Sequence, residues 1–269
     1  MFARIKNLFS DAQEEPHGAA IPAGQRVYAL GDIHGRLDLF EKLIEAIEED
    51  DRVAGPAETT VILLGDLVDR GPDSAGVIER ARAWQAQRNV RILAGNHEEM
   101  FLESFEREDV LRHFLRHGGR ETLFSFGIDP EAFRRASLEE VQVLMEEVVP
   151  PETRRFVAEF EDMIEIGDYL FVHAGINPAL PLGEQPRETV RWIREPFLSH
   201  GEAFERVVVH GHTINEQVQD RGNRIGIDTG AYASGRLTAL VVEDRQRRYL
   251  ETMQQADGTI VARPKVLGR

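Results

Sequence analysis

The chain has no cysteine among its 269 residues, which excludes disulfides, thiolate catalysis and cysteine-ligated zinc. Aromatic residues are scarce at 7%, and no apolar run approaches the ~20 residues of a membrane-spanning helix. Basic residues are in the minority, since 32 Lys and Arg against 47 Asp and Glu give a formal net charge of −15. This balance argues against general nucleic-acid binding, which needs a basic surface, although bound metal ions would attract an anionic substrate locally.

The length and the 42% hydrophobic content suit one large domain. We expect a loose lead-in over residues 1–25 and a single domain over 26–269, with a helical cap at about 100–165. The first nine residues alternate apolar and basic side chains, which predicts a short N-terminal helix. They lack the long apolar core of a signal peptide, so we expect a cytoplasmic protein without a transmembrane segment.

The first part of the chain alternates apolar runs with helical periodicity, which is typical of an α/β fold. Buried strands are expected at 26–30, 59–64 and 89–93, and helices at 37–47 and 74–87. The later part contains more strands than helices. Its expected strands are 169–172, 206–209, 224–227, 237–242 and 248–254.

Five short sequence motifs that combine Gly with Asp, Asn or His, called phrases below, are the most informative feature of the chain. At least four of them directly follow an apolar run. They are Gly31–Gly35, Gly65–Gly71, Gly95–Glu98, His173–Gly175 and His210–Thr213. Strand ends that carry oxygen and imidazole ligands are how a protein builds a two-metal hydrolytic site.

The phrases supply six candidate metal ligands without sulfur, which suits two divalent ions. Manganese is the first choice, iron and zinc are alternatives, and calcium fits less well. Asp66, at the end of the second strand, is the natural bridge between the ions. The full set is Asp32, His34, Asp66, Asn96, His173 and His212.

Four further residues have the chemistry that a phosphoryl-transfer site needs beside its metals. His97 directly follows Asn96, faces another direction and could act as a general acid. Asp69 could orient its imidazole and raise its pKa. Arg70 and Arg194 are candidate clamps for phosphate oxygens, because a guanidinium matches them bidentately.

Each phrase alone is weak evidence, since a Gly-Asp-x-His tetrapeptide is commonly an ordinary strand-to-turn junction. Five of them in one chain make a purely structural explanation improbable. His210 is expected to point away from the metals. Arg36 could contact substrate or simply pair with a nearby acid.

The ordered phrases resemble the calcineurin-like metallophosphoesterase superfamily, and more narrowly its phosphoprotein phosphatase branch in the bacterial and phage form. The resemblance covers roughly residues 27–243 and is most specific at Asp69–Gly71 and Gly95–Glu98. His117 departs from the pattern, because Asn commonly precedes the two glycines there. Trp192–Glu195 resembles the phrase that supplies a phosphate-binding arginine.

The resemblance implies a β-sandwich of two mixed sheets flanked by helices, with the site at the carboxyl edge of the strands. It implies that Asp32 and His34 bind the first metal and that Asp66 bridges. It assigns Asn96, His173 and His212 to the second metal. A bridging hydroxide would attack phosphorus directly without a phosphoenzyme, while His97, oriented by Asp69, protonates the leaving oxygen. The late phrase Ile227–Gly230 would support the site.

These features predict a metal-dependent phosphomonoester hydrolase of the serine/threonine protein phosphatase type, acting on a phosphorylated protein or a small phosphoester. A dinucleoside tetraphosphate hydrolase is the close alternative, and an inert metal-binding scaffold is an alternative of another class. A nuclease-type phosphodiesterase is disfavoured by the acidic balance. The scarce aromatic residues favour the phosphatase, because seven phenylalanines in the middle segment have helix-core spacing and leave few for a base pocket. The substrate, the native metal and the oligomeric state stay open.

Overall fold

The computed structural model describes residues 13–14 and 18–265. The expected N-terminal helix and much of the lead-in lie outside the described residues. Each strand expected from the sequence is present, with bounds that differ by two residues or fewer.

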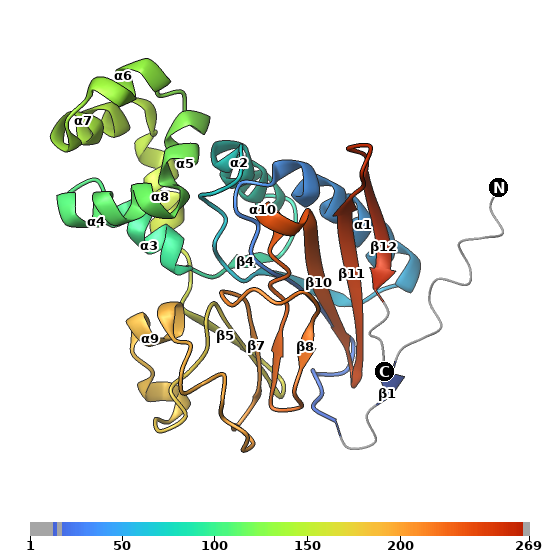
Figure 1. The fold of residues 1–269 in the computed structure, drawn as a ribbon. Helices are drawn as coiled ribbons and strands as arrows, with labels where there is room; N and C mark the ends of the chain where they lie inside the picture. The colour runs from blue at the N-terminus through green and yellow to red at the C-terminus, as the bar shows by residue number, and fades with distance from the viewer. Residues whose placement is uncertain (1–12, 15–17, 266–269) are drawn as a thin grey trace.

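A seven-stranded mixed sheet carries the first three phrases at its strand ends (Figure 1). Its strands β2, β3 and β4 are parallel, with β4 at the edge of the sheet, so their carboxyl ends lie on the same side. On the other side of β2 the sheet continues with antiparallel strands, in the order β10, β11 and then β1, while β12 also pairs with β11. The strands are β1 (Gln13–Glu14), β2 (Gln25–Leu30), β3 (Glu58–Leu63), β4 (Val90–Ile92), β10 (Arg236–Glu243), β11 (Gln246–Gln254) and β12 (Ile260–Lys265).

A five-stranded mixed sheet carries the two later phrases. Strands β6, β7 and β9 are parallel, and antiparallel β5 and β8 form the edges. Its members are β5 (Met163–Ile166), β6 (Tyr169–Val172), β7 (Val207–His210), β8 (Gln219–Asp220) and β9 (Arg224–Gly226).

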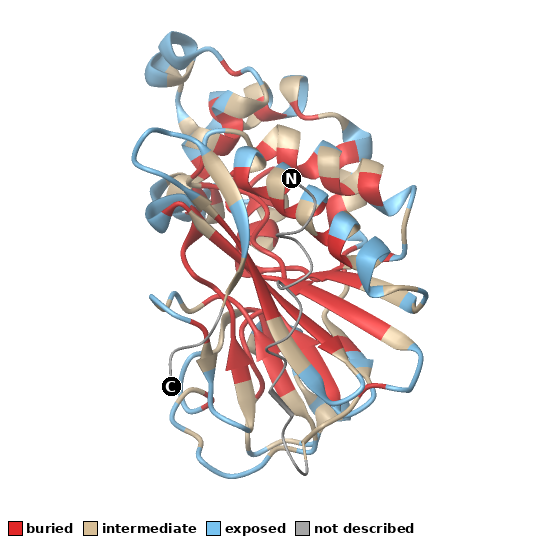
Figure 2. Cartoon of the chain, turned by 90° about the vertical axis from the view of Figure 1, so that its right-hand side faces the viewer, coloured by how far each residue is buried: buried red, intermediate tan, exposed pale blue. Residues whose placement is uncertain are grey.

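The alternation of side chains along β2 shows how the layers form, because successive residues of a strand face opposite sides. Val27 and Ala29 belong to the apolar cluster between the two sheets. Tyr28 and Leu30 face the opposite way, into the cluster under helices α1 (Leu37–Ala54) and α2 (Ser74–Gln85). The buried residues form a continuous band through both sheets (Figure 2). The fold is therefore the expected mixed α/β sandwich with flanking helices.

The middle segment forms a helical lobe at one side of the sandwich (Figure 1). Its helices end earlier than the expected boundary near 165, because Met163–Ile166 form β5. None of the described helices combines the length and apolarity that a membrane crossing requires. The lobe contains α3 (Asn96–Glu103), α4 (Glu108–Phe114), a π-helical turn (Leu115–Gly119), α5 (Arg120–Ser125), α6 (Pro130–Arg135), α7 (Leu138–Val148) and α8 (Pro151–Ala158).

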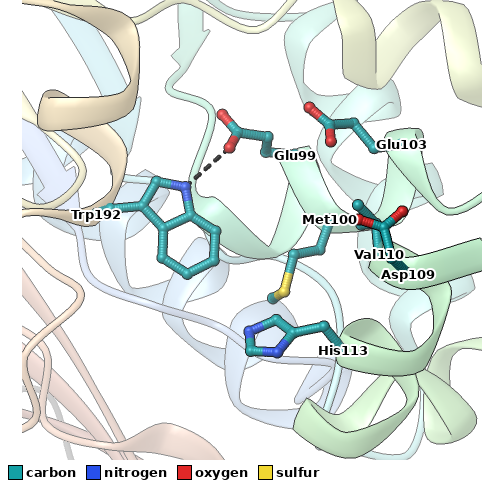
Figure 3. A pocket seen from close by; sticks show the side chains of 7 residues that line it. All are labelled: Glu99, Met100, Glu103, Asp109, Val110, His113 and Trp192. Carbon is teal, nitrogen blue, oxygen red and sulfur yellow. Dashed lines mark hydrogen bonds between the residues drawn. The ribbon is translucent and has the colours of Figure 1, made fainter. Parts of the chain in front are cut away.

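A cavity of about 240 Å³ lies where α3 and α4 meet the end of α9 (Arg187–Trp192). Figure 3 shows the indole of Trp192 and the imidazole of His113 on its border, with carboxylates on the opposite side. The cavity is lined by Glu99, Met100, Glu103, Asp109, Val110, His113 and Trp192. Two short helical segments complete the structure, η2 (Leu182–Glu184) and α10 (Ala231–Ser234).

Candidate metal centre

The five polar phrases meet at one place, where loops from both sheets converge. The loops turn sharply there, since five of the six non-glycine residues with positive φ among the described residues lie in these phrases. Such backbone conformations are costly for residues with a side chain and concentrate at functional sites. The five are His34, Asp66, Asp69, Arg70 and His212.

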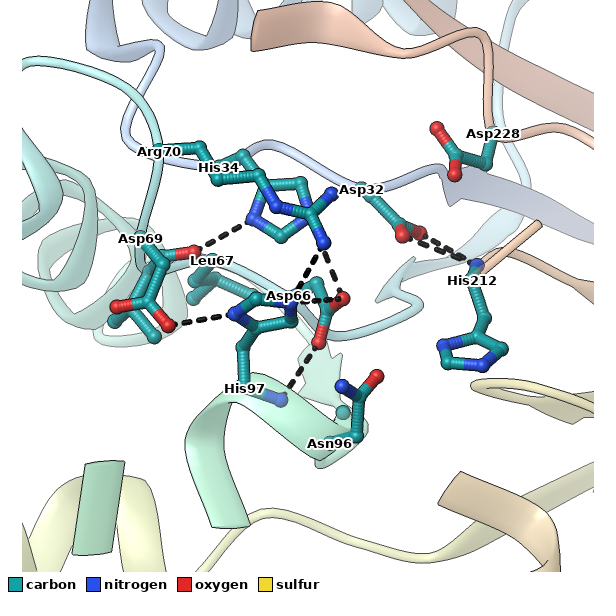
Figure 4. Close-up of polar contacts among 12 residues, drawn as sticks. Asp32, His34, Asp66, Leu67, Asp69, Arg70, Asn96, His97, His212 and Asp228 are labelled. Carbon is teal, nitrogen blue, oxygen red and sulfur yellow. Dashed lines mark hydrogen bonds and ion pairs between the residues drawn. The ribbon is translucent and has the colours of Figure 1, made fainter. Parts of the chain in front are cut away.

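Asp66 lies at the centre of the converging side chains (Figure 4). Its carboxylate is 3.4 Å from Nε2 of His34 and 3.4 Å from Nε2 of His173. It belongs to two groups of closely spaced ligand atoms, one with His34 and His97 and one with His173 and His212. Burial alone would raise the pKa of Asp66, but the surrounding imidazoles lower it below its ordinary value. A carboxylate shared by two groups is the arrangement that a bridging ligand needs.

The imidazoles are oriented so that Nε2 faces the centre. Nδ1 of His34 is 2.7 Å from the carbonyl of Val68, and Nδ1 of His173 is 2.8 Å from the carbonyl of Leu64. A carbonyl can only accept, so Nδ1 carries the proton and Nε2 keeps its lone pair. Nε2 of His212 is buried without a hydrogen-bond partner in the described chain. Burial, together with the neighbouring His173, lowers the pKa of His212 to about 3, so this ring is neutral.

Asn96 presents its amide oxygen to the same centre. Oδ1 of Asn96 is 3.1 Å from Nε2 of His173. Burial lowers the pKa of His173, so its ring is neutral and carries one proton, which lies on Nδ1 toward the carbonyl of Leu64. Nε2 of His173 and Oδ1 of Asn96 are therefore two acceptor atoms that face each other. Facing acceptors and the orphaned Nε2 of His212 are explained if a cation lies among them. The donor set therefore fits divalent metal ions.

Asp32 lies beside these groups but belongs to neither of them. Its carboxylate accepts the backbone N–H of His212 at 3.0 Å and lies near Asp228. Burial, Asp228 and Asp66 raise the pKa of Asp32 well above its ordinary value. The chain turns at His34, which has a φ of 47°.

His97 and Asp69 form the predicted pair. Nδ1 of His97 is 2.6 Å from Oδ2 of Asp69, and the hydroxyl of Thr122 donates to the other oxygen of Asp69 at 2.7 Å. Burial would lower the pKa of His97, but Asp66 and Asp69 outweigh it and raise the pKa above its ordinary value. An imidazole that holds its proton in this way is suited to donate it as a general acid.

The two arginines differ in position. Arg70 donates to Nε2 of His34 at 3.1 Å and to Nε2 of His97 at 2.9 Å. Its guanidinium also lies 4.8 Å from the ring centre of Tyr232, a residue that the sequence analysis did not single out. A metal ion bound to Nε2 of His34 would displace the contact that Arg70 makes with this atom. Arg194 is exposed, and its charge contributes to the low pKa of His212.

Glu98 is the buried residue whose part in the site the sequence analysis missed. Its carboxylate accepts backbone N–H groups from Asp66 and Gly95 at 2.8 Å, from Leu67 at 2.7 Å and from Val68 at 3.3 Å. Burial and the charge of Asp66 raise the pKa of Glu98 to about 7. The available signal was its place three residues after the glycine that precedes α3, where Glu commonly caps a helix.

The two residues of open role lie outside the centre. Arg36 pairs with Asp38 through two 2.8 Å bonds and donates to the carbonyl of Ala231. Of the two roles considered for Arg36, substrate contact or pairing with a nearby acid, the structure shows the pairing. His210 turns its Nδ1 to the carbonyl of Gly211 at 3.0 Å and belongs to neither ligand group.

Comparison with known proteins identifies relatives of this arrangement. The sequence model described as calcineurin-like phosphoesterase matches residues 25–237. A symmetrical bis(5′-nucleosyl)-tetraphosphatase of Acidovorax sp. (strain JS42) is 26% identical over 85% of this chain and 97% of its own length. Serine/threonine-protein phosphatase 1 of Salmonella typhimurium is 27% identical over 80% of this chain and 90% of its own length. The crystal structure of a candidate diadenosine tetraphosphatase has a TM-score of 0.59 at 21% identity, covering 93% of this chain and all of the other.

Proposed function

Because this chain belongs to the calcineurin-like phosphoesterase family, we propose that it hydrolyses bis(5′-nucleosyl) tetraphosphates at a two-metal centre. The family makes it a phosphoric ester hydrolase. The finer substrate assignment follows the symmetrical tetraphosphatase of Acidovorax sp., whose match spans 85% of this chain and 97% of its own length. It replaces the protein phosphatase expected from the sequence, which the comparisons support less well.

The observation that supports metal-dependent hydrolysis is the pair of ligand groups that share Asp66. The Nε2 atoms of His34, His173 and His212 and the amide oxygen of Asn96 would complete the binding of two ions, with the carboxylate of Asp32 as a further ligand. Manganese remains our first choice for this set of oxygen and nitrogen donors. Two divalent ions would supply Lewis-acid charge and a bound water of lowered pKa.

The other side chains would act on the substrate itself. Arg70, once turned from the imidazoles, would hold phosphoryl oxygens through its fork geometry, and exposed Arg194 would approach from the rim. Once Arg70 has turned away, Nε2 of His97 would be free to carry a proton and give it to the leaving phosphate oxygen, with Asp69 holding the ring in the orientation this requires.

Serine/threonine phosphatase activity is the second candidate, favoured by the Salmonella relative of similar coverage. The argument for it from scarce aromatic residues is weakened, because Trp192 and His113 line a cavity and Tyr232 lies over Arg70. An aromatic surface is therefore available to a nucleotide despite the low aromatic content.

A turnover panel with added manganese tests the proposal. It compares diadenosine tetraphosphate, a phosphoserine peptide and a small aryl phosphate. We expect kcat/KM for the dinucleotide to exceed that for the peptide at least tenfold, about 1.4 kcal/mol of transition-state binding. A preference for the peptide would assign the second candidate instead. Asp66→Asn should abolish every activity in the panel, because it removes the shared carboxylate.

A further inference from the structure

The cavity beside the metal centre lies at the distance that a base of the substrate would reach if a phosphate were bound at the metal centre. Helix α3 begins with Asn96 and His97 in the metal centre, and its later residues Glu99 and Glu103 line the cavity. At 1.5 Å per residue, these two lie about 5–10 Å along the helix axis from Asn96. A ribose and its phosphates separate a base from a reacting phosphate by a comparable length.

Trp192 gives the cavity a fixed aromatic wall. Its indole N–H donates to Oε1 of Glu99 at 2.8 Å (Figure 3). Arg191 donates to Oε2 of the same Glu99 at 3.0 Å. The ring of His113 lies 6.4 Å from that of Trp192, tilted by 42°. An indole held in one orientation offers a stacking surface at little entropic cost.

The opposite side of the cavity offers hydrogen-bond acceptors. Glu103 and Asp109 each hold Arg107 with one carboxylate oxygen, at 2.6 and 2.8 Å. Within residues 18–265, Arg107 is the only side chain that binds either carboxylate, and the backbone N–H of Val110 lies close to Asp109. An ionised carboxylate can only accept, so a ligand that binds at this edge would do so through hydrogen-bond donors. The negative charge also disfavours a phosphate in the cavity itself.

These properties select among ligands. The volume of about 240 Å³ is below the ~300–1,000 Å³ of pockets for drug-sized molecules, so it suits a single ring system. Guanine presents two adjacent donors, N1–H and its amino group, whereas adenine pairs one amino donor with an acceptor nitrogen. Carboxylates next to a stacking surface therefore match guanine better.

We propose that the cavity between Trp192, His113 and the carboxylates of Glu103 and Asp109 binds one base of the substrate, with guanine preferred to adenine. This subsite rests on the proposed hydrolysis of dinucleoside tetraphosphates and determines which of them is used best. The phosphates extend from the base along α3 toward Asn96 and the metal centre.

The test measures kcat/KM with manganese for diguanosine tetraphosphate, diadenosine tetraphosphate and an aryl phosphate. We expect the wild type to prefer the guanine dinucleotide. Trp192→Leu should lower the ratio of dinucleotide to aryl phosphate kcat/KM at least about fivefold, the lower range of base stacking. The double variant Glu103→Gln/Asp109→Asn should remove the preference for guanine. Glu106→Gln, an exposed neighbour outside the cavity, should leave all three rates unchanged.

The outcomes separate the two proposals. Dinucleotide turnover with unchanged ratios in both cavity variants would overturn the base subsite and leave the proposed function intact. Aryl phosphate turnover without dinucleotide turnover would overturn both. The double variant decides even if Trp192→Leu does not fold, because its two side chains are 43% and 73% exposed.

Discussion

At the scale of single residues, the contact of His97 with Asp69 predicts how catalysis depends on the leaving group. His97→Asn removes the proton donor, so hydrolysis of an alkyl phosphate should slow by about 10²–10⁴-fold. An aryl phosphate has a better leaving group and should lose much less. Steady-state rates on the two esters measure this difference, with His200→Asn as a control away from the ligand groups. An equal loss on both esters would assign His97 to positioning instead.

Glu98 predicts a second effect, on stability and metal binding together. Glu98→Gln keeps the size of the side chain but turns amide N–H groups toward backbone N–H donors. Leaving buried donors unsatisfied should lower the free energy of unfolding by about 2–3 kcal/mol. It should also weaken manganese binding, because the loop of Asp66 loses its anchor. Urea unfolding and metal titration check both, and Glu106→Gln should change neither.

The residues that form the site could be predicted from the sequence, but the hydrogen bonds and contacts between them could not. Asp66 and His97 are recognisable from their phrases, and the structure brings them together. The contact of Glu98 with Gly95 is a local helix cap, but its three contacts with Asp66, Leu67 and Val68 depend on how α3 meets the loop after β3, which no local pattern encodes. The contact of Tyr232 with Arg70 joins segments 162 residues apart for the same reason.

At the scale of elements, the apolar runs predicted most strands because buried strands need continuous hydrophobic side chains. Four shorter or more polar strands were missed, namely β1, β5, β8 and β12. β12 (Ile260–Lys265) carries Arg263 and Lys265, which pair with buried Glu251, so ion pairs accompany its backbone ladder. A pattern search for apolar runs does not detect such a strand.

The end of α1 is fixed to the sheet by charge, and this predicts a pH-dependent stability. Burial would raise the pKa of Asp51, but hydrogen bonds from Thr59, Arg26 and Arg88 hold it below its ordinary value. The carboxylate therefore stabilises the fold above the unfolded pKa of 3.8, and this contribution is lost as the pH falls through the folded pKa.

Asp51→Asn should accordingly reduce the free energy of unfolding at pH 7 by about 1–2 kcal/mol, allowing for partial exposure. The difference from wild type should shrink as the pH falls below about 4. Urea unfolding at several pH values measures it. Glu49→Gln removes an exposed i,i+3 pair with Arg52 and should have little effect at any pH. A constant difference down to pH 3 would contradict the electrostatic cause.

At the scale of the whole molecule, the candidate ligands come from two sheets. Asp32, Asp66 and Asn96 follow strands of the larger sheet, while His173 and His212 follow β6 and β7 of the smaller one. The apolar layer between the two sheets holds the sheets together, and none of the candidate metal ligands belongs to that layer. The sequence could place each ligand at a strand end, but only the packing of the sheets brings the two sets within reach.

Bound metal should therefore act as a cross-link between the sheets and raise the melting temperature. A ligand present at 100 times its Kd stabilises the fold by about 2.7 kcal/mol, which corresponds to roughly 5–10 °C for a chain of this size. Differential scanning calorimetry with manganese and then with excess chelator measures the shift. Asp66→Asn should lose most of it, because both ions depend on that carboxylate, whereas Glu106→Gln should keep it. A melting temperature that is the same with saturating manganese and with chelator would contradict a metal centre built from both sheets.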